Sequence, residues 1–145
     1  MSDLTDRPFT VQHIDHVVLR TEQMQAMAGF YQTLGAQVKR DALHELGMLQ
    51  LQLGQSMIDL VDVAGRLGQA GGAAPGPEGR NVDHIALRIA PFDEDAIIEF
   101  CQAHDIQSQR IDHDLLGADG YGPAVYVTDP DGNKVELKGS RNEAV

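Results

Sequence analysis

The stretch Ile14–Arg20, which reads IDHVVLR, decides the fold because Val82–Arg88 repeats it as VDHIALR. His84 follows His16 by 68 residues. In both stretches β-branched and other apolar residues surround the histidine, a composition that predicts a strand. A repeat at this distance indicates two copies of one supersecondary unit.

A second repeated pair comes later in each copy. The stretch MIDL at residues 57–60 corresponds to KVEL at residues 134–137, so that Glu136 follows Asp59 by 77 residues. Each copy therefore runs from a histidine strand to an acidic strand. The additional residues of the second copy fall between those strands, where loops accept insertions at little cost.

A helix is expected after each histidine strand. In the first copy, helical spacing connects Met24, Met27, Phe30, Tyr31 and Leu34, and Gly35 ends the helix. In the second copy Asp93 is the expected N-cap, and one helix face carries Ile97, Phe100, Cys101 and His104. We expect Cys101 to lie in the core.

Short strands complete both copies. They are expected at residues 48–53 and 56–63 in the first copy, and at residues 124–128 and 133–138 in the second. The turn at residues 54–55 joins the first pair. Asp129–Gly132, which reads DPDG, joins the second pair, because proline fixes φ and glycine permits a positive φ.

These elements predict an α+β fold of two βαβββ modules that form an incomplete eight-stranded, barrel-like cleft with the helices outside. We expect one domain over residues 1–145, with module 1 at about 11–64 and module 2 at about 82–138. The stretch at residues 65–81 is rich in Gly, Ala and Pro and is interpreted as a linker. Its length permits the modules to pair within one chain or across a dimer.

The charge of the chain excludes several classes of partner. A formal net charge of −11 and a pI of about 4.7 disfavour nucleic acids and anionic membranes. The single cysteine excludes an intrachain disulfide. The chain starts without a basic segment followed by an apolar one, so we expect a cytoplasmic protein.

Two histidines and two acids form the candidate metal site. Side chains alternate across a strand, so His16, Val18 and Arg20 share one face, as do His84, Ala86 and Arg88. A lone histidine on a strand is usually a satisfied polar residue. Here two of them hold equivalent places, each followed by an acid, Asp59 or Glu136. Such a set suits a divalent metal, namely Mn²⁺, Fe²⁺, Ni²⁺ or Zn²⁺.

The pattern resembles the vicinal oxygen chelate superfamily, which contains glyoxalase I, bleomycin-resistance proteins and extradiol dioxygenases. The motifs that carry the resemblance are Asp15–Leu19, Phe30–Gly35, Asp83–Leu87 and Asp129–Leu137. Together they cover about residues 11–138. The fold hosts many reactions, so the resemblance specifies the superfamily more closely than it specifies the chemistry.

The resemblance implies two alternative ligand sets. Glyoxalase I would place metal ligands at His16, Asp59, His84 and Glu136, with Glu136 also carrying the substrate proton. Fosfomycin-resistance thiol transferases and extradiol dioxygenases use the set that matches His16, His84 and Glu136. The glyoxalase I family usually has Glu where this chain has Asp59, and the shorter side chain leaves open whether Asp59 reaches the metal.

Substrate contacts are less clearly indicated. Arg20 matches a glutathione-holding arginine of glyoxalase I, but residues 60–63, which read LVDV, depart from that family. Arg20 and Arg88 are interpreted either as a clamp for an anionic substrate or as members of ion pairs. Tyr121, in the Gly-rich stretch 117–122, is expected either to contact the substrate from a flap over the cleft or to lie on a plain connector.

The sequence thus predicts a metal-dependent lyase or isomerase of the glyoxalase type, in which the metal polarises vicinal oxygens of the substrate and Glu136 is the base. One alternative is an Fe(II)-dependent extradiol-type dioxygenase that uses His44 or Tyr121 as base. The other is a metal-free ligand-binding protein like the bleomycin-resistance relatives. The resemblance also implies a homodimer.

Overall fold

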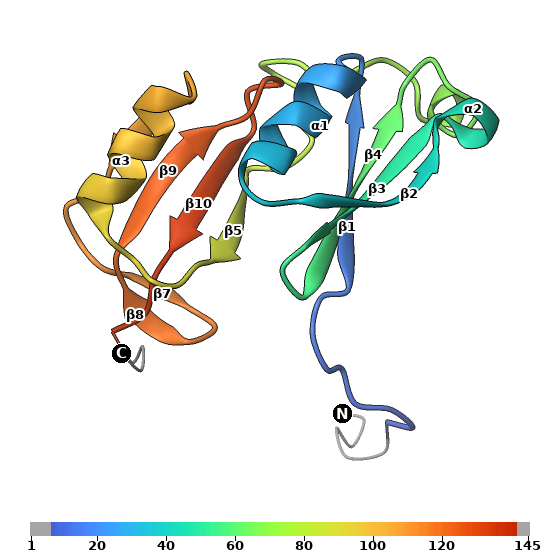
Figure 1. The fold of residues 1–145 in the computed structure, drawn as a ribbon. Coiled ribbons are helices and arrows are strands. Elements are labelled where there is room, and N and C mark those ends of the chain that lie inside the picture. The colour runs from blue at the N-terminus through green and yellow to red at the C-terminus, as the bar shows by residue number, and fades with distance from the viewer. Residues whose placement is uncertain (1–6, 142–145) are drawn as a thin grey trace.

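The computed structural model describes residues 7–141 and contains the two expected modules (Figure 1). Module 1 comprises β1 (His16–Thr21), α1 (Met24–Thr33), β2 (Gln37–Ala42), α2 (Leu43–Leu46), β3 (Met48–Leu53) and β4 (Ser56–Asp62). The short 3₁₀ helix η1 (Gly68–Gly71) follows in the linker. Module 2 comprises β5 (His84–Arg88), α3 (Glu94–Ala103), β6 (Ser108–Arg110), β7 (Leu115–Gly117), β8 (Gly120–Gly122), β9 (Ala124–Thr128) and β10 (Lys134–Lys138).

Each module builds one four-stranded sheet with the same topology. The strand orders are β1-β4-β3-β2 and β5-β10-β9-β6, and β7 and β8 form a separate hairpin. The histidine strand is parallel to the acidic strand in both sheets, and Val18 pairs with Asp59 as Ala86 pairs with Glu136. This equal register confirms the repeat. The described strands do not close into a barrel, so the chain presents open sheet faces.

The two long helices begin and end in different ways. Asp93 caps α3, because its carboxylate accepts a hydrogen bond from the Ala96 N–H at 3.1 Å. In contrast, α1 has no side-chain cap and depends on the burial of its apolar face, which includes Met27 and Tyr31. After α1 the chain turns at Gly35, whose φ of 111° favours glycine.

The helix α1 lies between the two sheets and connects them (Figure 1). The Tyr31 hydroxyl donates to the Asp129 carboxylate at 2.8 Å, and the Gln23 side-chain amide donates to Asp131 at 2.6 Å. One apolar cluster also runs through both modules, from Leu19 and Tyr31 to Cys101 and Val135. The described parts of the two modules therefore share a single core.

Two segments expected as irregular have defined structure. The Gly-rich stretch 117–122 belongs to the β7–β8 hairpin, in which Leu116 pairs with Tyr121. The linker is held by Arg20, whose guanidinium donates to the carbonyl oxygens of Gly68, Gly72 and Ala73 at 2.7–2.9 Å. Periodicity gives no signal for either segment, since both depend on contacts distant in sequence. Across residues 7–141, no helix has the length and apolarity to cross a membrane.

Candidate metal site

Module 1 contributes a histidine and a carboxylate on one face of its sheet. The register places Asp59 opposite Val18, and His16 lies two residues from Val18 on the same side of β1. Asp59 is only 3% exposed. Its Oδ2 accepts a hydrogen bond from the Gln50 side-chain amide at 3.1 Å, whereas its Oδ1 is buried and has no hydrogen-bond partner in the described structure.

Module 2 contributes an equivalent pair. Glu136 is 6% exposed and lies diagonally across from His84 on β5. Tyr126 of β9 is the cross-strand partner of Glu136. The Tyr126 ring also meets the His84 ring edge-on, with the centroids 6.4 Å apart. Burial, and then the charge of Glu136, raise the pKa of the Tyr126 phenol.

Each histidine is oriented by the aspartate that precedes it. The distance from His16 Nδ1 to the Asp15 carboxylate is 2.7 Å, and the distance from His84 Nδ1 to Asp83 is also 2.7 Å. The hydrogen bond that the His16 ring donates to Asp15 raises the pKa of His16, and the pKa of each aspartate is lowered by its histidine. This contact leaves Nε2 free to bind a metal ion and holds the orientation of the ring, as carboxylates do around metal-bound histidines.

The structure does not bring the two pairs together within one chain. Among residues 7–141, no group of three or more His, Cys, Asp or Glu side chains is close enough to hold a metal ion. The chain instead presents two half-sites, His16 with Asp59 and His84 with Glu136. Each half-site supplies one imidazole and one nearly buried carboxylate, which is half of an ordinary four-ligand set for a divalent metal.

The donor set fits a metal ion. A buried carboxylate oxygen without a donor, such as Asp59 Oδ1, costs free energy in the metal-free chain, and a cation would remove that cost. The histidine side chains are 45% and 40% exposed, so Nε2 remains accessible from the open face.

The expected substrate residues are otherwise engaged or lie apart. Arg20 uses its guanidinium on the linker carbonyls, and Arg88 forms an ion pair with Asp119 at 3.1 Å. Tyr121 lies on the β7–β8 hairpin and is 54% exposed. His44 lies on the short helix α2. None of these positions joins a half-site in the single chain.

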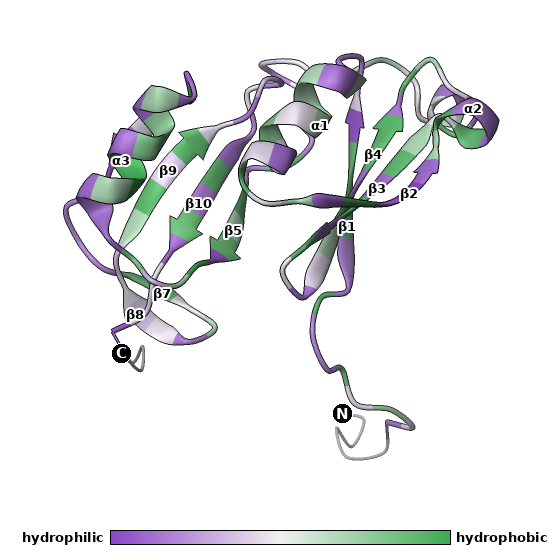
Figure 2. Cartoon of the chain, viewed as in Figure 1, coloured by the Kyte–Doolittle hydropathy of each residue, from purple (hydrophilic) through white to green (hydrophobic). Residues whose placement is uncertain are grey.

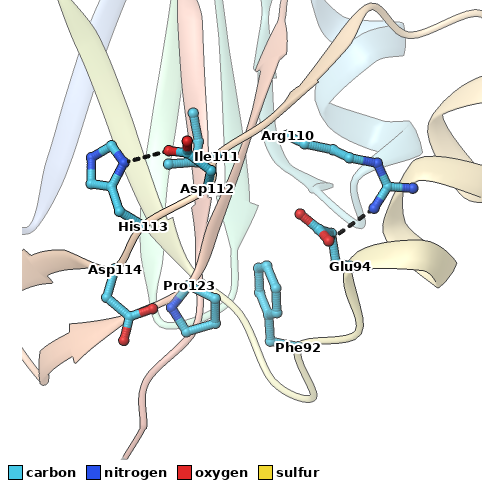
Figure 3. Close-up of a pocket in the computed structure, with 8 residues that line it drawn as sticks. All are labelled: Phe92, Glu94, Arg110, Ile111, Asp112, His113, Asp114 and Pro123. Carbon is cyan, nitrogen blue, oxygen red and sulfur yellow. Dashed lines mark hydrogen bonds and ion pairs between the residues drawn. The ribbon is translucent and has the colours of Figure 1, made fainter.

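A pocket of about 490 Å³ lies elsewhere in module 2 (Figure 3). Its charged side chains pair mostly with one another: Arg110 contacts Glu94 at 2.8 Å, and His113 contacts Asp112 at 2.8 Å. None of the expected metal ligands lines it. The pocket therefore offers no set of metal ligands. Its Asp112–His113 pair has the same Asp–His contact as the half-sites, so a substitution there can serve as a control for substitutions in the half-sites.

Sequence reasoning missed Gln50 and Tyr126. Each is the cross-strand neighbour of a candidate ligand, Asp59 or Glu136. Gln50 donates a hydrogen bond to Asp59, and the charge of Glu136 helps to raise the pKa of Tyr126. The available signal was a polar side chain in an otherwise apolar strand. Using it requires the strand register, which the internal repeat does not specify.

Comparisons with known proteins agree with this architecture. The model of the Glyoxalase/Bleomycin resistance protein/Dioxygenase superfamily matches residues 13–137. Comparison with curated proteins gave no significant sequence match.

Several solved structures share the fold. An integron cassette protein from Vibrio cholerae is 20% identical, with a TM-score of 0.67, and the alignment covers 90% of this chain and 97% of that one. The fosfomycin resistance protein FosX from Listeria monocytogenes, complexed with Mn(II) and sulfate, is 16% identical, with a TM-score of 0.64 and coverage of 92% and 94%. The antibiotic-binding protein TnmS3 from a Streptomyces species is 20% identical, with a TM-score of 0.62 and coverage of 91% and 98%.

These solved structures are too distant in sequence to indicate more than the fold. The family match spans most of the chain and includes both histidine strands and both acidic strands. This match agrees with the internal repeat and with the topology that both modules share. The chain therefore belongs to the Glyoxalase/Bleomycin resistance protein/Dioxygenase superfamily.

Proposed function

We propose that the protein is a metal-dependent enzyme of the glyoxalase-like type, a lyase or isomerase, whose small substrate chelates the metal through vicinal oxygens. His16 and Asp59 of one copy would hold the metal together with the partner's His84 and the partner's Glu136. The active protein is then a homodimer with two equivalent sites, and we expect it in the cytoplasm.

The observation that carries this proposal is the matched pair of half-sites. The register, the burial of the carboxylate and the Asp–His contact are the same in both modules. Each pair lies on the open face of its sheet, and the two pairs do not meet in one chain. A two-fold dimer would bring unlike halves together and complete two sites at once.

The residues around the metal divide the chemical work. The bound metal would act as a Lewis acid toward the substrate oxygens. Glu136 would accept and return the substrate proton, because its carboxylate lies on the metal face. Tyr126, the cross-strand partner of Glu136, would help to position it and keep water from one side of it. Gln50 would do the same for Asp59.

Imidazole and carboxylate ligands favour Mn²⁺, Fe²⁺, Ni²⁺ or Zn²⁺ over Ca²⁺. The FosX structure complexed with Mn(II) supports a divalent metal in this fold. Oxygen consumption distinguishes the two candidate reaction classes. An Fe(II)-loaded protein that consumes oxygen with catechols would be a dioxygenase, whereas a lyase or isomerase needs no oxygen.

The test is elemental analysis of the purified dimer and of two variants. We expect about one metal per chain in the wild type and loss of most of it in His84→Ala. The matched control is His113→Ala, which removes a histidine with the same aspartate contact outside the site and should keep its metal. Stoichiometric metal in His84→Ala would contradict the proposal. If the wild type takes up no metal but binds a ligand, the result would favour the alternative of a metal-free ligand-binding protein like the bleomycin-resistance relatives.

A further inference from the structure

A buried lysine follows the carboxylate of the second half-site on the same strand. Side chains alternate across β10, so Val135 and Leu137 enter the core. Glu136 and Lys138 therefore share the opposite face, and Figure 2 shows the alternation of hydrophobic and hydrophilic residues along β10. Lys138 is only 5% exposed. Because lysine is rarely buried without a partner of opposite charge, its burial beside the half-site requires an explanation.

The Lys138 ammonium has carbonyl partners but no carboxylate partner. Its Nζ donates to the carbonyl oxygen of Gly139 at 2.9 Å and to that of Gly120 at 3.2 Å. Within the part of the chain that the structure describes, no ion pair joins it to an aspartate or a glutamate. These bonds do not use all of the ammonium N–H groups. A buried positive charge without a counterion costs free energy, and a bound anion would remove that cost.

A second cation lies level with Lys138 on the neighbouring strand. The parallel register pairs Arg88 of β5 with Lys138, as it pairs Ala86 with Glu136. Paired residues point to the same side of a sheet, so Arg88 and Lys138 flank the half-site on its own face. Arg88 Nε donates to the Asp119 carboxylate at 3.1 Å, and the Asp119 side chain is 61% exposed. An exposed carboxylate thus contacts one of the two cations.

The β7–β8 hairpin closes over this pair of cations. It lies at the carboxyl ends of β5 and β10 (Figure 1). Its turn supplies the Asp119 carboxylate to Arg88 and the Gly120 carbonyl to Lys138. Gly117 also packs on the lysine, because a Cβ at this position would lie 3.1 Å from Lys138 Cε. The tip of the hairpin therefore presents to the cations the kind of oxygen atoms that a carboxylate ligand would present.

We propose that Lys138 and Arg88 bind a carboxylate of the substrate, which replaces the Asp119 carboxylate at Arg88 and the Gly120 carbonyl at Lys138. This inference rests on the proposed function, because the other end of the substrate binds the metal. Along β10, Lys138 lies about 6–7 Å beyond Glu136. The substrate class is then a small molecule that carries vicinal oxygens at one end and a carboxylate roughly that far away.

The first test uses two chelating probes that differ by a carboxylate. Catechol and 3,4-dihydroxybenzoate both present vicinal oxygens, and their binding to the zinc-loaded dimer is measured by calorimetry, because zinc has no redox chemistry. We expect the wild type to prefer 3,4-dihydroxybenzoate by about 10–100-fold, as for a charged hydrogen bond, and Lys138→Met to lose most of this preference. A Lys138→Met protein with the wild-type preference would overturn the proposal.

Lys134→Met is the matched control for this test. Lys134 lies on the same face of β10, as far before Glu136 as Lys138 lies after it, and its Nζ is 4.7 Å from the centroid of the Tyr126 ring. The substitution removes the same charge, and the preference should change by less than about threefold. Equal losses in the two lysine variants would indicate a general effect of charge and would also overturn the proposal.

The second test substitutes the carboxylate that the substrate displaces. Asp119→Asn preserves the size of an exposed side chain and removes the charge that competes for Arg88. We expect 3,4-dihydroxybenzoate to bind this variant about threefold more tightly than the wild type, with the affinity for catechol unchanged. If the contacts of Asp119 only hold the hairpin in place, binding of 3,4-dihydroxybenzoate will stay the same or weaken, and that result would overturn the proposal.

The metal-free protein separates this inference from the proposed function. Benzoate carries the carboxylate without vicinal oxygens, so its binding depends on the cations and not on the metal. If the wild type takes up no metal but binds benzoate more tightly than Lys138→Met does, the carboxylate site stands and the metal site fails. If both proteins take up metal and bind benzoate equally, the metal site stands and the carboxylate site fails.

Discussion

At the scale of single residues, the half-sites depend on aspartates that precede their histidines. Asp15 and Asp83 each lie one position before a candidate ligand, so strand alternation directs their side chains away from the face that carries the half-site. The structure nevertheless brings each carboxylate to 2.7 Å from the histidine Nδ1. The contact occurs at the first residue of each strand, where the chain is less constrained than in the sheet interior.

Asp83→Asn tests this orienting role. The amide is neutral and a weaker acceptor, so the imidazole loses its charge-assisted partner. We expect metal affinity to fall about 10–100-fold with little change in stability, measured by competition against a metal-binding dye. Asp112→Asn removes the same kind of contact from His113 and should leave affinity unchanged. Equal losses in both variants would show a nonspecific charge effect.

Asp59→Asn should affect stability and metal binding in opposite directions. Removing a buried charge whose Oδ1 lacks a partner should raise the free energy of unfolding of the metal-free protein by about 1 kcal/mol. Metal affinity should fall by more than the roughly 10–100-fold typical of an outer-sphere partner. Urea unfolding with and without metal measures both quantities. An unchanged affinity would assign the three-ligand set without Asp59.

At the scale of elements, the repeat predicted both modules, and strong local signals predicted several boundaries. The strands expected at 48–53 and 124–128 have those bounds in the structure, and Asp93 caps α3 as its position indicated. The hairpin at 115–122 was not predicted, because its strands have three residues each and contain several glycines. The sequence also could not predict that the two half-sites lie apart within one chain, because the linker is long enough for the modules to pair either within a chain or across a dimer.

The helix α1 depends on one buried hydrogen bond to module 2. The Tyr31 hydroxyl donates to Asp129, which also accepts hydrogen bonds from Asn133. Burial and this carboxylate raise the pKa of Tyr31 well above its ordinary value of 10. A raised pKa means that the folded state holds the proton more tightly. The resulting stability is complete below pH 10 and is lost as the pH rises further.

Tyr31→Phe removes both the hydrogen bond to Asp129 and the phenol whose pKa is raised. At pH 7 we expect a loss of about 1–2 kcal/mol, because Asp129 loses one of its donors. Above pH 10 the wild type should lose stability more steeply than the variant, so the difference between them should shrink. Urea unfolding at pH 7, 9.5 and 10.5 measures this trend. A difference that grows with pH would contradict the assigned cause.

At the scale of the whole molecule, a complete metal site of the proposed kind requires two copies of the chain. The single chain has one continuous core but two open sheet faces that each carry half a ligand set. Metal should therefore stabilise the dimer over the monomer, and a chelator should weaken dimerisation. Sedimentation at micromolar protein, with added metal and then with EDTA, should show a lower dimer fraction after chelation. A dimer fraction that is unchanged by EDTA would contradict this prediction and show that the dimer forms independently of metal binding.

The most direct test of a site shared between two chains is metal binding by a mixture of two variants that each bind no metal alone. His16→Ala and His84→Ala each damage every site of their own homodimers. In a mixed dimer, the intact His16 of one chain meets the intact His84 of the other and restores one of two sites. After subunit exchange of equal amounts, the account predicts metal at about one quarter of the wild-type sites, since half of the dimers are mixed. Metal content no higher than in the separate variants would contradict a site shared between two chains.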